Sequence, residues 1–270
     1  MKKSLLLLCA LAALMVSCGK SGEEVEKISV FKTYNEHHYY KLNLPDSLKF
    51  DEQDAYTEIK IFLQWPQKIN GCEVPDLQKE LIAYLFADSL GTNIDECIAT
   101  ELAKPLFYDD PKGITQEEVD SIPQEFCSYS SVSLKPTYMG EKIYSFAIDS
   151  SDYMQGAAHG FYSTNYVVYD VEKKKVIKLD DLFTNKAALV EMITNQIKAD
   201  FDEEDSCIDY NLIKETDNFF IADSGIVFQY NPYEIACYAQ GIVKARIDFY
   251  NFFGKDCLTP YAKELFNINE

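Results

Sequence analysis

Positive charge is scarce in this sequence of 270 residues. Its 25 lysines and arginines are outnumbered by 44 aspartates and glutamates, which gives a formal net charge of −19. Contacts to phosphate need clustered Lys and Arg, so neither nucleic acid nor anionic lipid headgroups are expected as main partners. A basic protein or cations would suit this charge better. Solubility alone also explains an acidic surface.

The common catalytic and cofactor motifs are missing as well. The chain contains no Gly-x-Ser-x-Gly elbow, no His-x-x-x-His pair and no phosphate-binding glycine loop. It has no Cys-x-x-Cys pair, so neither a zinc site nor thioredoxin-like chemistry is expected. Internal repeats and low-complexity stretches are absent too. We therefore predict a protein that is not an enzyme and that uses no metal or cofactor.

Long apolar runs are limited to the start of the chain. Lys2 and Lys3 precede an apolar stretch, residues 5–16, and Ser17-Cys18 follows it. This order is typical of a bacterial lipoprotein signal, in which Cys18 becomes the lipidated first residue. The stretch is too short for an ordinary membrane-spanning helix, and no other run reaches the roughly 18 residues needed.

The mature protein is therefore expected to be anchored by lipid at the cell envelope. We expect residues 1–17 to be removed and residues 18–30, which are polar, to form a tether. The tether begins Gly-Lys-Ser-Gly-Glu-Glu after Cys18, and both the periplasmic face of the outer membrane and the cell surface remain open as locations. Processing removes two lysines and no acid, so the formal charge moves from −19 to −21.

Cysteine is present in an even number after processing. Cys9 leaves with the signal and Cys18 takes the lipid. Six cysteines remain, and they are Cys72, Cys97, Cys127, Cys207, Cys237 and Cys257. Six cysteines allow 15 pairings, among which the sequence cannot choose. Several can equally be buried free thiols, but an exported chain permits disulfides and we expect at least one.

The hydrophobic pattern predicts an α+β fold, in which an antiparallel sheet carries helices on one face. Residues 31–130 form the first part. A strand from Tyr56 to Trp65 alternates apolar and polar residues, and Pro66 is expected to end it. Helices are predicted to begin near Pro75, Asn93 and Thr115. Trp65, the single tryptophan, is expected to anchor this part of the core.

Residues 131–270 form the second part, in which strands predominate. Leu189, Ile193, Ile197 and Phe201 fall every four residues, so a helix that starts at Thr184 or Asn185 is expected to pack one apolar stripe on the sheet. The remaining predicted elements are strands at 130–138, 144–148, 162–171, 176–179, 219–222, 226–230 and 243–249, and a short helix in the tail.

Two segments carry a family resemblance. Residues 142–183 combine an aromatic strand, a Gly-Ala-Ala-His-Gly turn, a Tyr-Asp strand, a charged turn and Leu-Asp-Asp-Leu-Phe; residues 219–249 contain Asn-Pro-Tyr-Glu-Ile followed by Tyr-Ala and Gly. Together they resemble the C-terminal extracytoplasmic domain of RsiV-type anti-sigma factors and the non-catalytic part of PdaC-type peptidoglycan deacetylases. The resemblance covers roughly residues 130–250.

This resemblance implies a receptor-like function. RsiV-type proteins bind lysozyme, but they also carry a cytoplasmic sigma-binding segment and a membrane helix, neither of which this sequence contains. Sigma-factor regulation is therefore not expected. The first hypothesis is a non-catalytic envelope lipoprotein that binds lysozyme or a related cationic wall hydrolase. The alternative is a module that binds peptidoglycan or another polysaccharide.

An envelope hydrolase that uses His159 and an acid is a third hypothesis. His159 lies between glycines, where a hydrogen bond to the backbone of a tight turn explains it equally well. His37 and His38 are adjacent, so on a strand they face opposite ways and cannot chelate one ion. The pair Asp180-Asp181 could serve glycoside hydrolysis, but helix capping explains it better.

Aromatic residues near the two signature turns are the candidate contacts for a ligand. Tyr153, Phe161, Tyr162, Tyr233 and Tyr238 form this set, and most of them can also be core residues. The candidate ligand-binding residues are Tyr153, His159, Tyr162, Tyr233 and Glu234.

Overall fold

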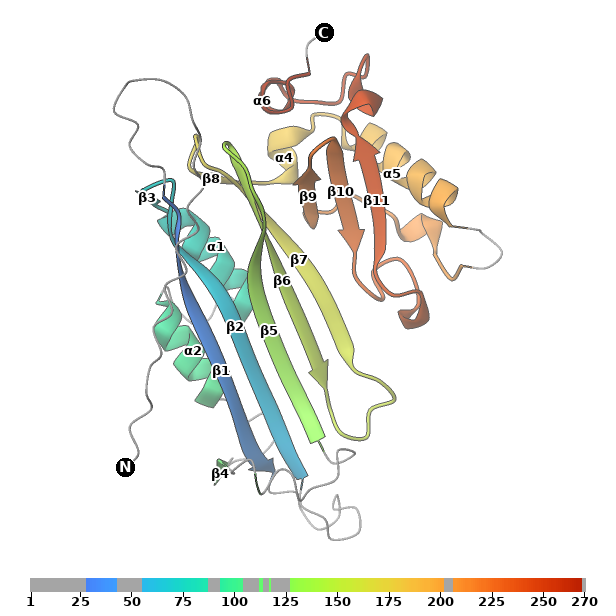
Figure 1. Cartoon of the computed structure of the whole chain (residues 1–270). Helices are drawn as coiled ribbons and strands as arrows, with labels where there is room; N and C mark the ends of the chain where they lie inside the picture. The colour runs from blue at the N-terminus through green and yellow to red at the C-terminus, as the bar shows by residue number, and fades with distance from the viewer. Residues whose placement is uncertain are drawn as a thin grey trace.

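The computed structural model describes residues 28–42, 55–86, 93–103, 112–113, 117, 127–201 and 206–268. These residues form an eight-stranded sheet, a three-stranded sheet and the helices that cover them (Figure 1). The α+β class predicted from the sequence is confirmed. The sequence pattern predicted one sheet and did not predict the division into two. The described helices include none that is long and apolar enough to cross a membrane.

The large sheet has the strand order β4-β1-β2-β5-β6-β7-β8, with β3 paired to β2. It is antiparallel except for one pair, since β2 and β5 run parallel from Tyr56↔Cys127 to Leu63↔Leu134. Its strands are β1 (Val30–Leu42), β2 (Ala55–Ile69), β3 (Cys72–Glu73), β4 (Lys112–Gly113), β5 (Cys127–Met139), β6 (Ile143–Tyr153), β7 (Phe161–Asp170) and β8 (Lys175–Ile177).

Helices α1 (Pro75–Phe86) and α2 (Ile94–Ala103) cover one face of the large sheet. Both helices lie at the predicted positions. Their apolar stripes are buried, as at Leu77, Leu81 and Cys97. They pack on the inward side chains of β2 and β6, and Trp65 lies buried in that cluster as predicted. Of the helix predicted from Thr115, only Glu117 lies within the described residues.

Two predictions for the first part of the chain were wrong in detail. Pro66 does not end β2, which continues to Ile69. Beyond Leu63 the strand has no β5 partner, so the missing N–H of Pro66 leaves no ladder bond unmade on that side. The strand β1 was also not predicted, and it pairs with β2 along its full length.

The small sheet has the order β11-β10-β9. Leu189, Ile193 and Ile197 on α5 are buried in the core of this part, and the Asn185 side chain caps the helix by accepting a hydrogen bond from the Ala188 amide. The elements are α4 (Leu179–Leu182), α5 (Lys186–Asp200), η3 (Tyr210–Leu212), β9 (Phe219–Ala222), β10 (Gly225–Tyr230), η4 (Tyr238–Gln240), β11 (Val243–Asp248), η5 (Phe249–Phe252) and α6 (Pro260–Leu265).

Side-chain amides join the small sheet to the free edge of β7. Asn218 donates to the Thr164 carbonyl at 2.9 Å and accepts from the Tyr166 amide at 3.0 Å, so it pairs with β7 as a strand backbone would. Gln229 donates to the same Thr164 carbonyl at 2.7 Å, and Asn231 accepts from the Thr164 amide at 2.9 Å. These bonds satisfy an edge that β8 leaves unpaired.

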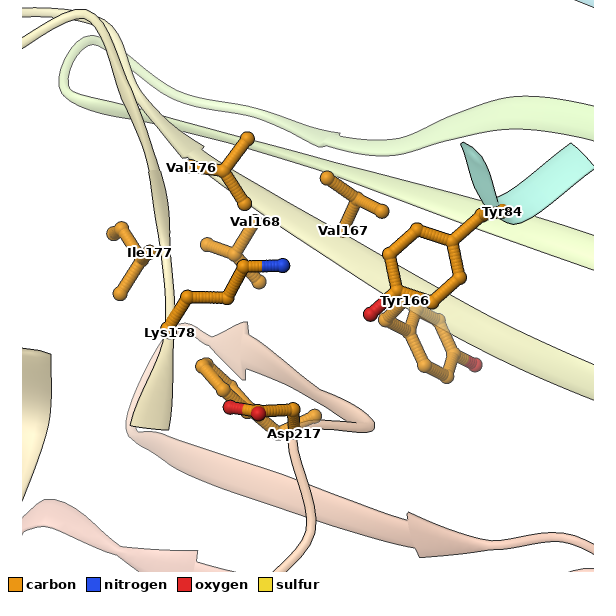
Figure 2. Close-up of a pocket in the computed structure, with 9 residues that line it drawn as sticks. Tyr84, Tyr166, Val167, Val168, Val176, Ile177, Lys178 and Asp217 are labelled. Atoms are coloured by element: carbon orange, nitrogen blue, oxygen red, sulfur yellow. The ribbon is translucent and has the colours of Figure 1, made fainter. Parts of the chain in front are cut away.

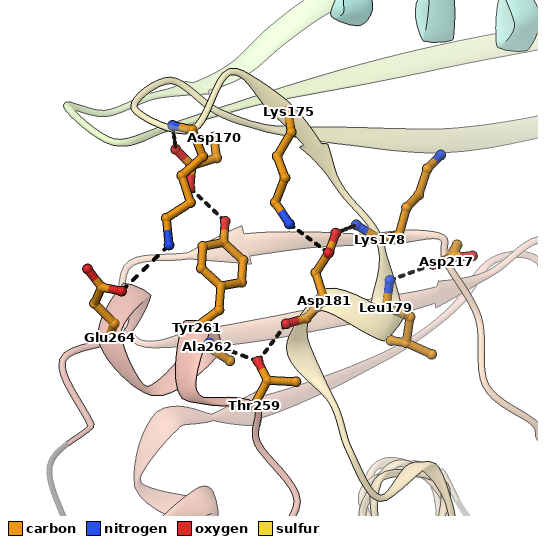
Figure 3. Close-up of polar contacts among 11 residues, drawn as sticks. Asp170, Lys175, Lys178, Leu179, Asp181, Asp217, Thr259, Tyr261, Ala262 and Glu264 are labelled. Carbon is orange, nitrogen blue, oxygen red and sulfur yellow. Dashed lines mark hydrogen bonds and ion pairs between the residues drawn. The ribbon is translucent and has the colours of Figure 1, made fainter.

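A second junction lies where β8 meets the C-terminal helix. A cavity of about 10 Å³, room for roughly one water, lies between Tyr84 on α1 and Asp217 (Figure 2). Buried Asp170 at the end of β7 accepts a hydrogen bond from Tyr261 of α6 at 2.7 Å (Figure 3). Lys178 forms an ion pair with Glu80 of α1 at 2.8 Å. The Tyr261–Asp170 contact therefore joins α6 to the large sheet, and the Lys178–Glu80 pair joins the end of β8 to α1.

Candidate functional site

The turn between β6 and β7 presents His159 at the surface. Its Nδ1 lies 2.8 Å from the Gly160 carbonyl, as the turn interpretation predicted. A carbonyl can only accept, so Nδ1 carries the proton and Nε2 is left as an acceptor. The Tyr233 hydroxyl lies 3.0 Å from Nε2 and donates to it. Among the described residues, the hydrogen-bond partners of His159 are a backbone carbonyl and a phenol, and they include no carboxylate.

The two signature segments meet at this histidine. The His159 and Tyr238 rings stack with centroids 3.7 Å apart and an interplanar angle of 14°. Tyr162 on β7 meets Tyr238 edge-on at 5.7 Å. We call His159, Tyr162, Tyr233 and Tyr238 the aromatic cluster. It joins three of the predicted ligand residues, together with Tyr238 from the wider aromatic set, across a separation of 74 residues between His159 and Tyr233.

The loop that carries Tyr233 and Tyr238 is held in place by contacts from both sides. A disulfide joins Cys207 to Cys237, the residue before Tyr238, so the expectation of at least one bridge is confirmed. Among the other described cysteines, Cys72, Cys127 and Cys257 are free. Glu234, predicted to bind ligand, accepts a hydrogen bond from the Asn231 amide at 2.8 Å and therefore shapes the loop.

Two residues of the loop have unusual backbone angles. Tyr233 has a φ of 72°, a left-handed conformation that bulky side chains rarely adopt. Gly241 has φ 73° and ψ −149°, a region accessible almost only to glycine. A Cβ at Gly241 would lie 3.1 Å from the Tyr162 hydroxyl. The glycine therefore lets the loop approach the cluster closely.

A second aromatic pair adjoins the aromatic cluster. Tyr153, the remaining predicted tyrosine, stacks on Tyr129 of β5 with centroids 5.8 Å apart. A Cβ at Gly160 would lie 3.0 Å from the Tyr129 hydroxyl, so the pair lies against the His159 turn. Loss of solvent raises the pKa of the Tyr238 phenol, and the phenols of Tyr162 and Tyr129 add to this rise. Sequence reasoning missed Tyr129, because only the register of β5 on β6 places it opposite Tyr153.

The sheet face on which these tyrosines lie carries neither of the described helices α1 and α2. Cross-strand partners share a face, so Lys60, Ser131, Ser151 and Tyr162 form one row across four strands. The neighbouring row is Phe62, Ser133, Asp149 and Thr164. The described helices α1 and α2 lie on the opposite face (Figure 1). The two rows line a surface groove of about 430 Å³, which we call the sheet groove.

Asp180 and Asp181 are both engaged in local contacts. Asp181 accepts from the Lys178 amide at 2.9 Å and from Lys175 Nζ at 2.6 Å, while Asp180 forms an ion pair with Lys186 in the first turn of α5 (Figure 3 shows Asp181). Capping and charge pairing therefore account for both, as expected. The described residues contain no group of three or more His, Cys, Asp or Glu side chains placed to hold a metal ion.

One family model matches the small-sheet part of the chain. Residues 180–250 match the family described as "Protein of unknown function (DUF3298)". This DUF3298 region runs from α4 to the start of η5 and supplies Tyr233, Tyr238 and both disulfide cysteines. It includes the second signature segment and leaves most of the first outside. No curated protein matches the sequence.

Two solved structures of the DUF3298 family share the fold. A member from Bacteroides fragilis NCTC 9343 is 22% identical, covers 86% of this chain and 94% of its own, and has a TM-score of 0.61. A protein from Pseudomonas aeruginosa PAO1 is 15% identical, covers 86% of this chain and 95% of its own, and has a TM-score of 0.57. At these identities the likeness concerns the fold. The resemblance to RsiV-type and PdaC-type proteins is not confirmed by these comparisons and stays a prediction.

Proposed function

We propose that this protein is a non-catalytic binding protein of the cell envelope and that its partner is a cationic protein, such as lysozyme or a related wall hydrolase. The partner docks on the aromatic cluster. The observation that carries this proposal is the convergence of two distant segments on one exposed stack of His159, Tyr233 and Tyr238.

The exposure of the residues around the cluster supports a protein partner. Tyr233 is 56% exposed, Phe161 45% and Met154 48%, so large apolar side chains face solvent at one end of the sheet. Tyr, Phe and Met are enriched in protein interfaces, where aromatic anchors supply much of the binding energy. These side chains are too exposed to serve as core residues, so their exposure favours a binding role.

Charge supports a cationic partner. The whole chain carries −19. Exposed Glu234 follows Tyr233 in the chain, and exposed Asp152 lies opposite Phe161 on the neighbouring strand. An acidic surface accelerates the encounter with a basic protein and makes binding sensitive to salt. We propose further that Cys18 carries the lipid that holds the protein at the envelope; residues 1–27 lie outside the described residues.

The test is a titration of residues 19–270 with a c-type lysozyme at low and at physiological salt. We expect saturable binding that weakens with salt but persists, and a loss of at least about ten-fold for Tyr233→Ala. Tyr250→Ala is the matched control, because Tyr250 is 67% exposed and follows the far end of β11. Binding that vanishes at physiological salt, or that Tyr250→Ala weakens equally, would leave only nonspecific charge attraction.

A glycan is the second candidate ligand, and the sheet groove favours it. Peptidoglycan or another polysaccharide would be bound by hydroxyl contacts and ring stacking, and its affinity would change little with salt. A hydrolase that uses His159 has less support, because Gly160 and Tyr233 are its hydrogen-bond partners. Turnover of an envelope substrate that His159→Ala abolishes with the fold intact would establish a hydrolase instead.

A further inference from the structure

The sheet groove owes its depth to small side chains. Ser131, Ser133 and Ser151 lie on β5 and β6, the two middle strands of the groove, where strands commonly carry β-branched or aromatic residues. Phe62 and Tyr162, on strands to either side, are larger and rise at its borders. A volume of about 430 Å³ lies within the range of small-ligand sites.

The hydroxyls of the groove keep hydrogen-bonding capacity. Ser131 reaches the Ser151 carbonyl and hydroxyl only at 3.4 Å each, and Ser133 reaches Asp149 at 3.3 Å. Each hydroxyl has one donor and two acceptor positions, so these long contacts leave positions for a ligand. Asp149 also accepts from Thr164 at 2.9 Å and, being a carboxylate, has further lone pairs to offer.

The charges of the groove are balanced. Lys60 contributes one cation and pairs with Glu58 at 2.8 Å, while Asp149 contributes one anion and lies 3.9 Å from Lys135. The groove therefore offers donors and acceptors without a strong net field. At its end, Tyr162 stands against Tyr238, which adds an aromatic surface suited to the apolar face of a sugar ring.

We propose that the sheet groove binds a neutral glycan chain, with sugar hydroxyls on Ser131, Ser133, Ser151 and Asp149 and one sugar ring against Tyr162. This deepens the second candidate function and rests on it. A protein partner fits the groove less well, because serine is depleted in protein interfaces whereas this hollow is lined largely by serines. The aromatic cluster and the sheet groove are thus adjoining sites that share Tyr162 and differ in ligand chemistry.

The experiment is calorimetric titration with two neutral hexasaccharides, one of glucose and one of N-acetylglucosamine. We expect at least one of them to bind, with equal affinity at low and physiological salt. The double variant Ser131→Val, Ser151→Val removes both hydroxyls with side chains that suit a strand, and it should weaken binding by at least about ten-fold. Thr137→Val, exposed on the same strand but outside the groove, should bind as the wild type does.

The lysozyme titration separates this inference from the first proposal. The serine double variant should keep its affinity for lysozyme, whereas Tyr233→Ala should lose it and still bind the hexasaccharide. A wild type that binds neither hexasaccharide, or a double variant that binds as tightly as wild type, would overturn the glycan site whatever the lysozyme result. Unchanged melting temperatures of the variants would show that the fold is intact.

Discussion

The ring of His159 lies face to face with the ring of Tyr238, with centroids 3.7 Å apart, although one residue follows a strand of the large sheet and the other follows a strand of the small sheet, in different signature segments. The contact depends on a chain of supports. A disulfide fixes the residue before Tyr238, and Asn231 ties the loop to the edge of β7. The first three predictions below change this loop at one place at a time.

Tyr233 has a strained backbone conformation, in which its side chain reaches the aromatic cluster. Its φ of 72° costs a residue with a Cβ about 1 to 2 kcal/mol relative to glycine. Tyr233→Gly is therefore expected to be about 1 kcal/mol more stable than Tyr233→Ala, while both lose lysozyme binding equally. Urea unfolding and the titration measure the two effects. Equal stability of the two variants would show that the backbone relaxes once the ring is gone.

Gly241 is required where the loop passes Tyr162. Gly241→Ala should lower the free energy of unfolding by about 2 kcal/mol, since the backbone angles disfavour a side chain and the new Cβ lies 3.1 Å from the Tyr162 hydroxyl. Gly254→Ala is the control, because Gly254 has φ 69° but nothing within 4 Å of an added Cβ. If both variants lose the same stability, the close approach to Tyr162 contributes nothing.

The disulfide between Cys207 and Cys237 closes a loop with a sequence separation of 30. Replacing both residues by serine is expected to lower stability by about 3 kcal/mol, because the unfolded chain gains conformational freedom. The same change should weaken lysozyme binding, since Cys237 immediately precedes Tyr238. Cys72→Ser, a change at an exposed free cysteine, should leave melting temperature and affinity unchanged. A double variant with wild-type affinity would mean that the remaining loop contacts suffice.

Asp181 gives stability that depends on pH. Burial raises the pKa of its carboxyl group, but the hydrogen bonds from Lys175 and the Lys178 amide outweigh burial, so the pKa lies below its ordinary value. A depressed pKa means that the stabilisation is complete above the unfolded pKa of about 3.9 and is lost as pH falls through the folded value. Asp181→Asn should therefore cost about 2 kcal/mol at pH 7, and the difference from wild type should shrink below about pH 4.

The control for this prediction is the neighbouring carboxylate. Asp180 is 80% exposed and pairs with Lys186 at the surface, so Asp180→Asn should change stability by less than about 0.5 kcal/mol. Thermal unfolding of the three proteins between pH 3 and pH 7 compares them. A difference for Asp181→Asn that stays constant over this range would show that its charge does not stabilise the fold.

The sequence alone determined the elements whose two faces differ in polarity. Helices α1, α2 and α5 have one buried stripe each, β11 alternates buried and exposed residues, and β6, β7, β9 and β10 are rich in aromatic and β-branched residues, so period and propensity located them. The predicted set of tyrosines around His159 also came from composition near two turns. Strand β1 was not predicted. Its side chains are half-buried on one face and exposed on the other, as at Tyr34 and Asn35, so its sequence shows no apolar alternation.

Only the tertiary structure decided how these parts meet. Register, set by backbone pairing, aligned the serines of β5 and β6 into a groove and put Tyr129 opposite Tyr153. The parallel pairing of β2 with β5 and the pairing of Cys207 with Cys237 join segments far apart in the chain. A local pattern records which face of a strand is buried, but it does not record which distant strand lies beside it, because that choice is made by packing of the whole core.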